Sequence, residues 1–185
     1  MNISVCDMAY RSGNERVGSR IEDKVPYRNC VNILSLNIAG INDKKKRALA
    51  KVYLSTLKAD IVCLQETHIQ YSEKYILDSL GLNRINVTKQ QCRNRGVAVL
   101  ARIKPDFKFR SSSDTQGRWA INEIQIKGAV YTICSLYGAN TDDPMVIDTV
   151  NAELFAWPSP LIICGDFNCS IKKTTGSETF TTRKP

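Results

Sequence analysis

Several apolar runs of this sequence end in side chains that carry oxygen or amide groups. The residues at these ends are Asn37, Glu66, Tyr137, Asn140, Asp166 and Asn168. Each one alone has an ordinary explanation, because an acid or amide at a strand end more often forms a turn or caps a helix. Their repetition in one short chain favours a shared site, since residues just beyond strand ends collect in one crevice of a layered α/β fold.

These residue types suit the hydrolysis of a phosphate ester. Mg²⁺ prefers oxygen ligands and keeps several waters, so one or two carboxylates hold it beside a phosphate. In such a site Glu66 would bind the metal, Mg²⁺ or Mn²⁺, and Asp166 would orient or deprotonate the attacking water. The remaining groups would supply neutral hydrogen bonds to the phosphate: Asn37, Asn140, Asn168 and the hydroxyl of Tyr137.

Short aliphatic runs predict the strands that place these side chains. The segments VNILSLN (31–37), DIVCLQE (60–66) and PLIICGDFN (160–168) are typical of buried strands. Further extended segments are expected at 84–88, 96–102, 119–126 and 129–137, and Lys127-Gly128 is a plausible hairpin turn between the last two.

Three helices are expected between these strands. The first begins near Asn42 and Asp43, and its predicted buried stripe is Leu49, Val52, Tyr53 and Leu57. The second runs from Ser72 and ends before Gly81. The third follows Asp143-Pro144 and faces the core with Ile147, Val150 and Leu154. This order of elements predicts mixed α/β layers rather than a doubly wound sheet.

Composition indicates a globular domain with a basic surface. Of the 185 residues, 43% are hydrophobic and 24% are charged, and the net charge is +8. A basic balance favours a polyanionic partner, either nucleic acid or an anionic membrane surface. We expect no membrane span and no secretion, because the sequence lacks a long apolar run and a signal-peptide core.

The cysteine pattern argues for an intracellular protein. The seven cysteines are scattered and form no C-x-x-C pair, which disfavours both a zinc site and a disulfide framework. Cys63, Cys134 and Cys164 lie inside apolar runs, where a reduced cysteine acts as a small hydrophobe.

Basic residues are concentrated between positions 84 and 110 and again at 44–47. A solvated surface and a DNA contact explain these clusters equally well. The candidates for nucleic-acid contact are Arg93, Arg95 and Arg118. Trp119 follows Arg118, and we expect it to be a core aromatic rather than a platform for a base.

Five motifs in order give the sequence a family resemblance: ILSLNIAGIN, IVCLQETH, RGVAVL, SLYGANT and LIICGDFN. They resemble the endonuclease/exonuclease/phosphatase superfamily from Val31 to Ile171. QETH with GDFN, and a basic helix directly after the first strand, look most like the endonucleases of LINE-type retrotransposons. Cellular abasic-site endonucleases are similar but usually have a lysine after the glutamate motif and GDLN in place of GDFN.

The resemblance implies a role for each matching position. Asn37 matches the active-site asparagine and Glu66 the metal-binding glutamate of the family. Tyr137 and Asn140 match residues that position the scissile phosphate, and the catalytic loop is matched by Asp166 and Asn168. One mild departure is Ala139, where the family pattern has a proline.

The resemblance also implies an incomplete four-layer α/β sandwich of two sheets packed face to face. The family continues past GDFN to a Ser-Asp-His motif whose histidine contacts the phosphate, and this sequence does not contain that motif. His68 is the only histidine and matches the ordinary residue after QET, so we expect it to lie near Glu66 without a catalytic role.

We therefore expect three regions: a flexible leader over 1–29, a partial domain over 30–171 and a polar tail over 172–185. The strand at 160–168 is expected to lack a neighbour on one side.

The expected function is that of a Mg²⁺-dependent DNA endonuclease of retrotransposon type, impaired by the missing motif and nuclear if it acts on DNA. One alternative is an inactive remnant that at most binds nucleic acid. Another is an abasic-site endonuclease or a different phosphoesterase of the same superfamily.

Overall fold

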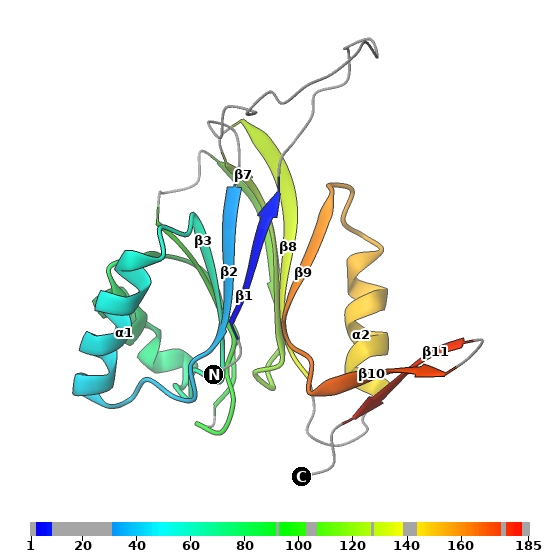
Figure 1. The fold of residues 1–185 in the computed structure, drawn as a ribbon. Coiled ribbons are helices and arrows are strands. Elements are labelled where there is room, and N and C mark those ends of the chain that lie inside the picture. Colours follow the sequence, from blue (N-terminus) through cyan, green and yellow to red (C-terminus); the bar gives the residue numbers. More distant parts are fainter. Residues whose placement is uncertain are drawn as a thin grey trace, which may run out of the picture.

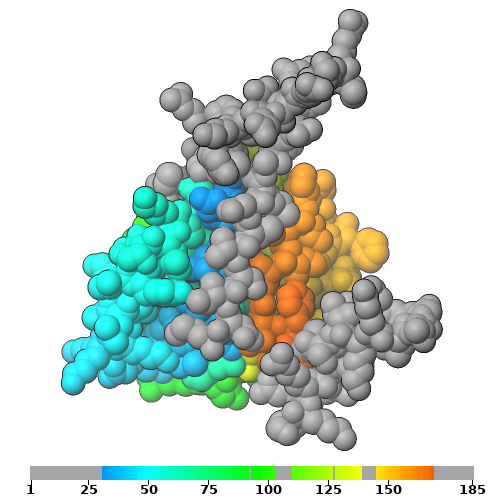
Figure 2. Space-filling model, viewed as in Figure 1, coloured from blue at the N-terminus to red at the C-terminus, as the bar shows by residue number. Residues whose placement is uncertain are grey.

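The computed structural model describes residues 3–8, 31–91, 93–102, 107–126, 128–138, 144–174 and 177–182. Its elements form four layers, in the order helices, sheet, sheet, helix (Figure 1). Figure 2 shows the blue-to-cyan part of the chain on one side of the molecule and the yellow-to-orange part on the other. The mixed α/β fold with layered sheets that the sequence predicts is confirmed.

One sheet, here sheet A, has the strand order β1-β2-β3-β5-β4. Its strands are β1 (Ile3–Met8), β2 (Val31–Asn37), β3 (Ile61–Gln65), β4 (Asn83–Val87) and β5 (Ala98–Ala101). The pair β2–β3 is parallel and the other pairs are antiparallel. Helices α1 (Lys44–Thr56) and η2 (Tyr71–Leu80) cover its outer face.

The second sheet, sheet B, has the strand order β6-β7-β8-β9. Its strands are β6 (Phe107–Ser113), β7 (Trp119–Ile126), β8 (Ala129–Tyr137) and β9 (Leu161–Asp166). Helix α2 (Pro144–Leu154) connects the parallel strands β8 and β9 and packs on the outer face, where Trp119 is buried as expected. A separate hairpin follows, made of β10 (Cys169–Thr174) and β11 (Ser177–Thr182).

An apolar core lies between the two sheets and depends on strand alternation. Every second residue of a strand faces the same side. Ile33 of β2 and Ile61 of β3 therefore meet Ile133 of β8 and Ile162 of β9 in one cluster. The same alternation turns Asn37, at the end of β2, toward the space between the sheets. The carboxyl ends of β2, β3, β8 and β9 lie together at the lower edge in Figure 1.

The buried stripe of α1 differs from the one predicted. Leu54 is 1% exposed and packs with Ala50, Tyr53 and Leu57, whereas Leu49 is 71% exposed. Val52 is exposed as well. The sequence RALAKVYLSTL allows two overlapping stripes with a helical period, and sheet A accepts the one that contains Leu54.

Helix α2 follows its predicted pattern in part. Val150 and Leu154 are buried against sheet B, as expected, and Trp157 joins them. Ile147 is 44% exposed, because Val146 takes the place beside the cluster. The predicted cap Asp143 lies outside the described residues.

Two predicted turns are confirmed. Ile126 pairs with Ala129 across a tight turn in which Gly128 has φ +81°. The second predicted helix ends at Gly81, which adopts the left-handed conformation with φ 75°. That helix has 3₁₀ rather than α geometry.

Strands occur in both regions that were expected to be irregular. β1 lies within the predicted leader and pairs with β2 from Ile3↔Leu36 to Met8↔Val31. This pairing satisfies N–H and C=O groups that the edge of β2 would otherwise expose. The hairpin β10–β11 occupies most of the predicted polar tail, and its threonines have a high strand propensity that outweighs the lack of apolar alternation.

Strand β9 lies at the edge of sheet B, as the sequence predicts. Within the described part of the chain it pairs with β8 alone. Leu161 and Ile163 on its outer side are exposed beside α2. The described residues include no helix with the length and apolar character needed to cross a membrane.

Candidate active site

The side-chain amide of Asn37 joins two carboxylates that come from different sheets. Its Nδ2 donates to Oε1 of Glu66 at 2.9 Å and to Oδ2 of Asp166 at 2.8 Å. Its Oδ1 accepts from the backbone N–H of Ala39 at 3.0 Å, which fixes the orientation of the amide. Asn37 ends β2 and Glu66 follows β3 in sheet A, whereas Asp166 ends β9 of sheet B. The predicted residues of the two sheets are therefore one cluster.

Glu66 reaches this cluster because the chain turns sharply after β3. Gln65 faces the space between the sheets, so regular alternation would point Glu66 toward the helices. Instead Glu66 has φ 52°, a left-handed conformation that non-glycine residues rarely adopt. Ala39, His68 and Asn168, which also surround the cluster, have positive φ values too. Such strain costs of order 1–3 kcal/mol per residue and is typical of functional sites.

The loops after β2 and β3 are held together by backbone hydrogen bonds. The N–H of Gly40 donates to the carbonyl of Glu66 at 2.6 Å, and that of Ile41 donates to the carbonyl of Thr67 at 3.1 Å. These bonds extend the parallel pairing of β2 and β3 beyond the ends of the strands and link the two loops.

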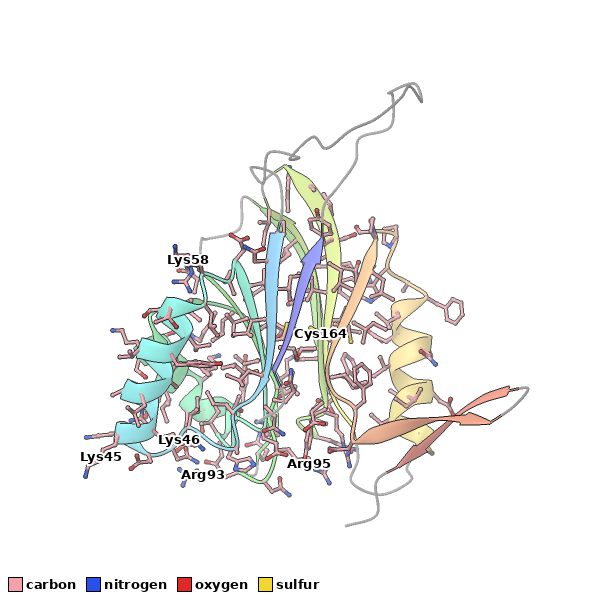
Figure 3. All side chains as sticks on the ribbon, viewed as in Figure 1. Lys45, Lys46, Lys58, Arg93, Arg95 and Cys164 are labelled. Carbon is pink, nitrogen blue, oxygen red and sulfur yellow. The ribbon has the colours of Figure 1, made fainter. Side chains whose placement is uncertain are left out.

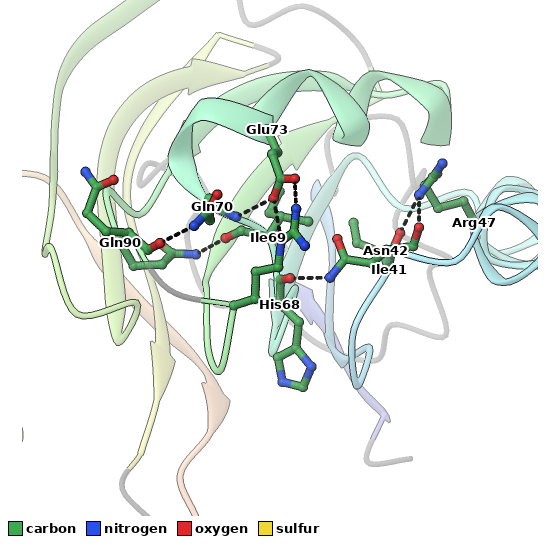
Figure 4. Close-up of polar contacts among 10 residues, drawn as sticks. Ile41, Asn42, Arg47, His68, Ile69, Gln70, Glu73 and Gln90 are labelled. Carbon is green, nitrogen blue, oxygen red and sulfur yellow. Dashed lines mark hydrogen bonds and ion pairs between the residues drawn. The ribbon is translucent and has the colours of Figure 1, made fainter.

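Polar side chains fasten the same loops from the outer side (Figure 4). The amide of Asn42 donates to the carbonyl of His68, and the guanidinium of Arg47 donates to the carbonyls of Ile41 and Asn42. The start of α1 is therefore tied to the loop that carries Glu66.

His68 lies beside the Glu66 carboxylate, as the sequence predicts. Its Nε2 is 3.5 Å from Oε2 of Glu66. The imidazole lies against Gly40, where an added Cβ would be 3.0 Å from Nδ1. A residue with a side chain at position 40 would therefore displace the ring.

Asp166 is held by the loop that follows β9. Its Oδ1 accepts from the backbone N–H of Asn168 at 3.2 Å, so both carboxylate oxygens have a donor. The Asn168 side chain donates to the carbonyl of Gly138 at 3.1 Å, and the N–H of Gly138 donates to the carbonyl of Asp166 at 2.7 Å. Position 138 requires glycine, because a Cβ would lie 2.2 Å from the carbonyl oxygen of Phe167.

The donor set of this cluster suits a hard divalent cation. Glu66 and Asp166 offer carboxylate oxygens, and the Glu66 side chain is 22% exposed, so water reaches it. The described residues contain no cluster of three or more His, Cys, Asp and Glu side chains that would form a closed metal site. One or two carboxylates with open positions fit Mg²⁺ or Mn²⁺, which keep bound water, better than a structural zinc ion.

A family model for the Endonuclease/Exonuclease/phosphatase family matches residues 34–185, which span all of these side chains. The chain belongs to this family.

Solved structures of known proteins share this family's fold. The chain is similar to an AP endonuclease from Archaeoglobus fulgidus, with a TM-score of 0.56 at 18% identity over 75% of this chain and 57% of that one. It is similar to TDP2 from D. rerio, solved with a single-strand DNA product, with a TM-score of 0.57 at 15% identity over 75% of this chain and 60% of that one.

A third similar structure is the 3′ phosphatase NExo from Neisseria, bound to a product DNA hairpin. The TM-score is 0.53 at 20% identity, over 74% of this chain and 57% of that one. The chain thus spans less than two thirds of the length of each of these three proteins.

The structure brings most of the predicted family residues together. Asn37, Glu66, Asp166 and Asn168 form the hydrogen-bonded cluster. Tyr137 is opposite Asp166 in the pairing of β8 with β9 and is nearly buried, facing the other sheet. Asn140, like Ala139, lies outside the described residues.

Arg93 and Arg95 lie along the same lower edge of the molecule as Lys45 and Lys46 (Figure 3). Arg93 forms an ion pair with Glu73, and hydrogen bonding to Arg93 lowers the pKa of Glu73. The carbonyl of Arg95 accepts from the backbone N–H of His68 at 2.8 Å.

The third predicted contact, Arg118, has a different environment. Its side chain is 7% exposed, so it is buried rather than presented on the surface. Its carbonyl accepts from the backbone N–H of Tyr137 at 2.7 Å, which places the Arg118 backbone next to Tyr137.

Asp114 organises the loop before Arg118, and sequence reasoning missed it. Its carboxylate accepts from the backbone N–H groups of Gly117 at 3.1 Å and Arg118 at 2.9 Å. Burial raises the pKa of Asp114, and these hydrogen bonds oppose the shift. The signal was the pattern Asp-x-x-Gly, which is typical of a turn closed by an aspartate side chain.

Substituting Asp114 by alanine should destabilise the fold by about 1–3 kcal/mol, because buried N–H groups lose their acceptor. Asp114→Asn keeps a side-chain oxygen at the same place and should lose about 1 kcal/mol or less. Urea unfolding of the two variants and the wild-type chain measures both values. Equal losses for the two variants would show that these hydrogen bonds do not hold the loop.

Proposed function

We propose that this chain carries the metal-binding and water-activating part of a divalent-metal-dependent phosphodiesterase that cleaves DNA. The observation that supports it most is the Asn37 amide, which holds Glu66 and Asp166 side by side. Two carboxylates linked through one amide, at a solvent-accessible edge, suit a single hard cation and an attacking water.

Each residue has a distinct part in the proposed hydrolysis. Glu66 binds the cation, and Asp166 accepts the proton of the water that attacks phosphorus. A bound divalent cation supplies positive charge to the phosphate and to the oxygen that leaves. Asn37 keeps both carboxylates in place, while Asn168 holds Asp166 toward the attacking water. Tyr137 and Asn140 position the phosphate.

DNA is the proposed substrate because basic residues lie along the edge that carries the carboxylates. Lys45, Lys46 and Arg95 lie there in Figure 3. Phosphate contacts of this kind give affinity without sequence choice. The similar TDP2 and NExo structures contain DNA products, which supports a nucleic-acid substrate here. A protein that acts on chromosomal DNA in a eukaryotic cell would be nuclear.

Within the family, we propose the retrotransposon type. The motifs QETH and GDFN and the basic start of α1 at 44–47 support this choice over an abasic-site endonuclease. The Ser-Asp-His motif is not found in these 185 residues, so the chain alone should be a weak nuclease. The second candidate is a chain that binds nucleic acid without cutting it, which the basic edge alone would support.

Nicking of supercoiled plasmid in Mg²⁺ tests the proposal. Glu66→Ala and Asp166→Ala should each lower the rate by about 10²–10⁴-fold, the range for loss of a group that takes part in proton transfer or charge stabilisation. Asp148→Ala removes an exposed acid of α2 and should leave the rate unchanged. EDTA should abolish nicking in every sample.

The outcomes separate the candidates. Nicking that survives both substitutions would place the activity elsewhere. A wild-type chain that binds duplex DNA but never nicks it would establish the second candidate.

The basic edge has a separate test. Arg95→Gln should weaken duplex binding and reduce the slope of log affinity against log salt by about one, because one phosphate contact is lost. Lys58→Gln removes the same charge at the opposite end of the fold and should change neither value (Figure 3). Fluorescence anisotropy at several salt concentrations measures both. Equal effects of the two variants would mean that net charge, not this edge, attracts DNA.

A further inference from the structure

A buried polar group lies directly beneath the carboxylate cluster. Gln65 of β3 is completely buried and faces sheet B. Its Nε2 donates to Oγ of Ser135 at 3.0 Å and to the carbonyl of Cys63 at 3.2 Å, and its Oε1 accepts from Oγ of Ser35 at 3.4 Å. All of its polar atoms therefore have partners.

The bond to Ser135 crosses from one sheet to the other. Gln65 and Ser35 belong to sheet A, whereas Ser135 belongs to β8 of sheet B. The bond to Ser35 stays within sheet A, where β2 and β3 are already paired. Of the two bonds from Gln65 to serines, one links the two sheets and the other lies within sheet A.

The position of this cross-sheet bond matches the position of the site. Gln65 is opposite Asn37 in the β2–β3 pair and directly precedes Glu66. Ser135 precedes Tyr137 by one alternation step, and Tyr137 is opposite Asp166. The bond therefore begins in the row of Asn37 in sheet A and ends one alternation step before the row of Asp166 in sheet B.

Apolar packing alone would specify only loosely the offset between the sheets, meaning the position of one sheet relative to the other within the plane of their contact. The core around Ile33, Ile61 and Ile133 is aliphatic, and such contacts are non-directional. A buried hydrogen bond has a narrow range of length and angle, so it selects one offset. A buried polar side chain adds little net stability compared with an apolar one of the same shape, so stability does not explain why a glutamine is here.

We propose that Gln65 is a positioning residue that sets the offset of sheet A against sheet B, so that Asn37 meets both Glu66 and Asp166. It acts through Asn37 and does not touch the substrate. The metal-binding part of the test rests on the proposed function, whereas the part that follows Asn37 does not.

Two serine variants form a matched pair for the test. Ser135→Ala and Ser35→Ala each remove one hydroxyl that bonds to Gln65, but only the first breaks the link between the sheets. Gln65→Met removes the bonds to both serines and the bond to the carbonyl of Cys63, while keeping a side chain of similar length. Urea unfolding of each variant accounts for any general loss of stability.

The direct readout is the Nδ2 amide of Asn37 in nitrogen–proton NMR spectra, assigned by its loss in Asn37→Ala. Ser135→Ala and Gln65→Met should speed hydrogen exchange of this amide about tenfold, the effect of weakening one buried hydrogen bond. Ser35→Ala should leave the rate within about twofold. The double variant Gln65→Met/Ser135→Ala should behave like Gln65→Met alone.

A second readout is Mn²⁺ affinity, measured by water-proton relaxation of the full chain. It should fall about tenfold in Ser135→Ala and stay unchanged in Ser35→Ala. If the wild-type chain binds no Mn²⁺, the proposed function fails, and the Asn37 amide still decides the role of Gln65.

Equal effects of the two serine variants on the Asn37 amide would overturn the inference, because Gln65 would then be ordinary packing. An unchanged Asn37 amide in Ser135→Ala would overturn it as well. If Gln65→Met does not fold, hydrogen exchange of the Asn37 amide in Ser135→Ala and Ser35→Ala tests the inference without it.

Discussion

The shared amide of Asn37 is the contact on which the site depends. Its Nδ2 bonds both to Glu66, which follows a strand of sheet A, and to Asp166, which ends a strand of sheet B. Two neighbouring carboxylates repel one another, and an N–H donor between them reduces that cost. Because the donor has two hydrogens and a fixed orientation, both sheets must keep a defined separation for the arrangement to exist. The packing of the layers, the hydrogen-bonded loops and the bond from the buried Gln65 to Ser135 all help to fix that separation.

The loops around Asn37 combine strain with dense hydrogen bonding. Glu66 and His68 hold left-handed conformations that a flexible loop would avoid, and the backbone bond from Gly40 to Glu66 keeps the loop in place. The Glu66 carboxylate therefore points toward Asn37 and not toward the helices, where strand alternation would place it. Rigid placement of this kind favours catalysis, since charged groups that are already oriented need not reorganise during the reaction.

The sequence predicted the layers and the meeting of Asn37, Glu66 and Asp166 at one edge, and it failed where packing decides. Alternation and strand ends correctly placed Asn37 and Asp166 at one edge, because those signals are local. The buried face of α1 was predicted only in part. Tyr53 and Leu57 pack against the core as expected, but the helix offers two apolar stripes, and only the partner sheet selects Leu54 over Leu49. The burial of Arg118 was missed for a similar reason: charge in a sequence does not reveal how the chain packs over it. β1 was missed because an edge pairing depends on a distant segment.

The central claim is that side chains of both sheets form one cation site. Paramagnetic broadening of backbone amide signals during a Mn²⁺ titration tests it most directly, because broadening falls steeply with distance from the ion. The account predicts that the amides of Asn37, Glu66 and Asp166 lose intensity together at the same low Mn²⁺ concentration. Broadening confined to one sheet, or centred on Asp148 of α2, would contradict the account.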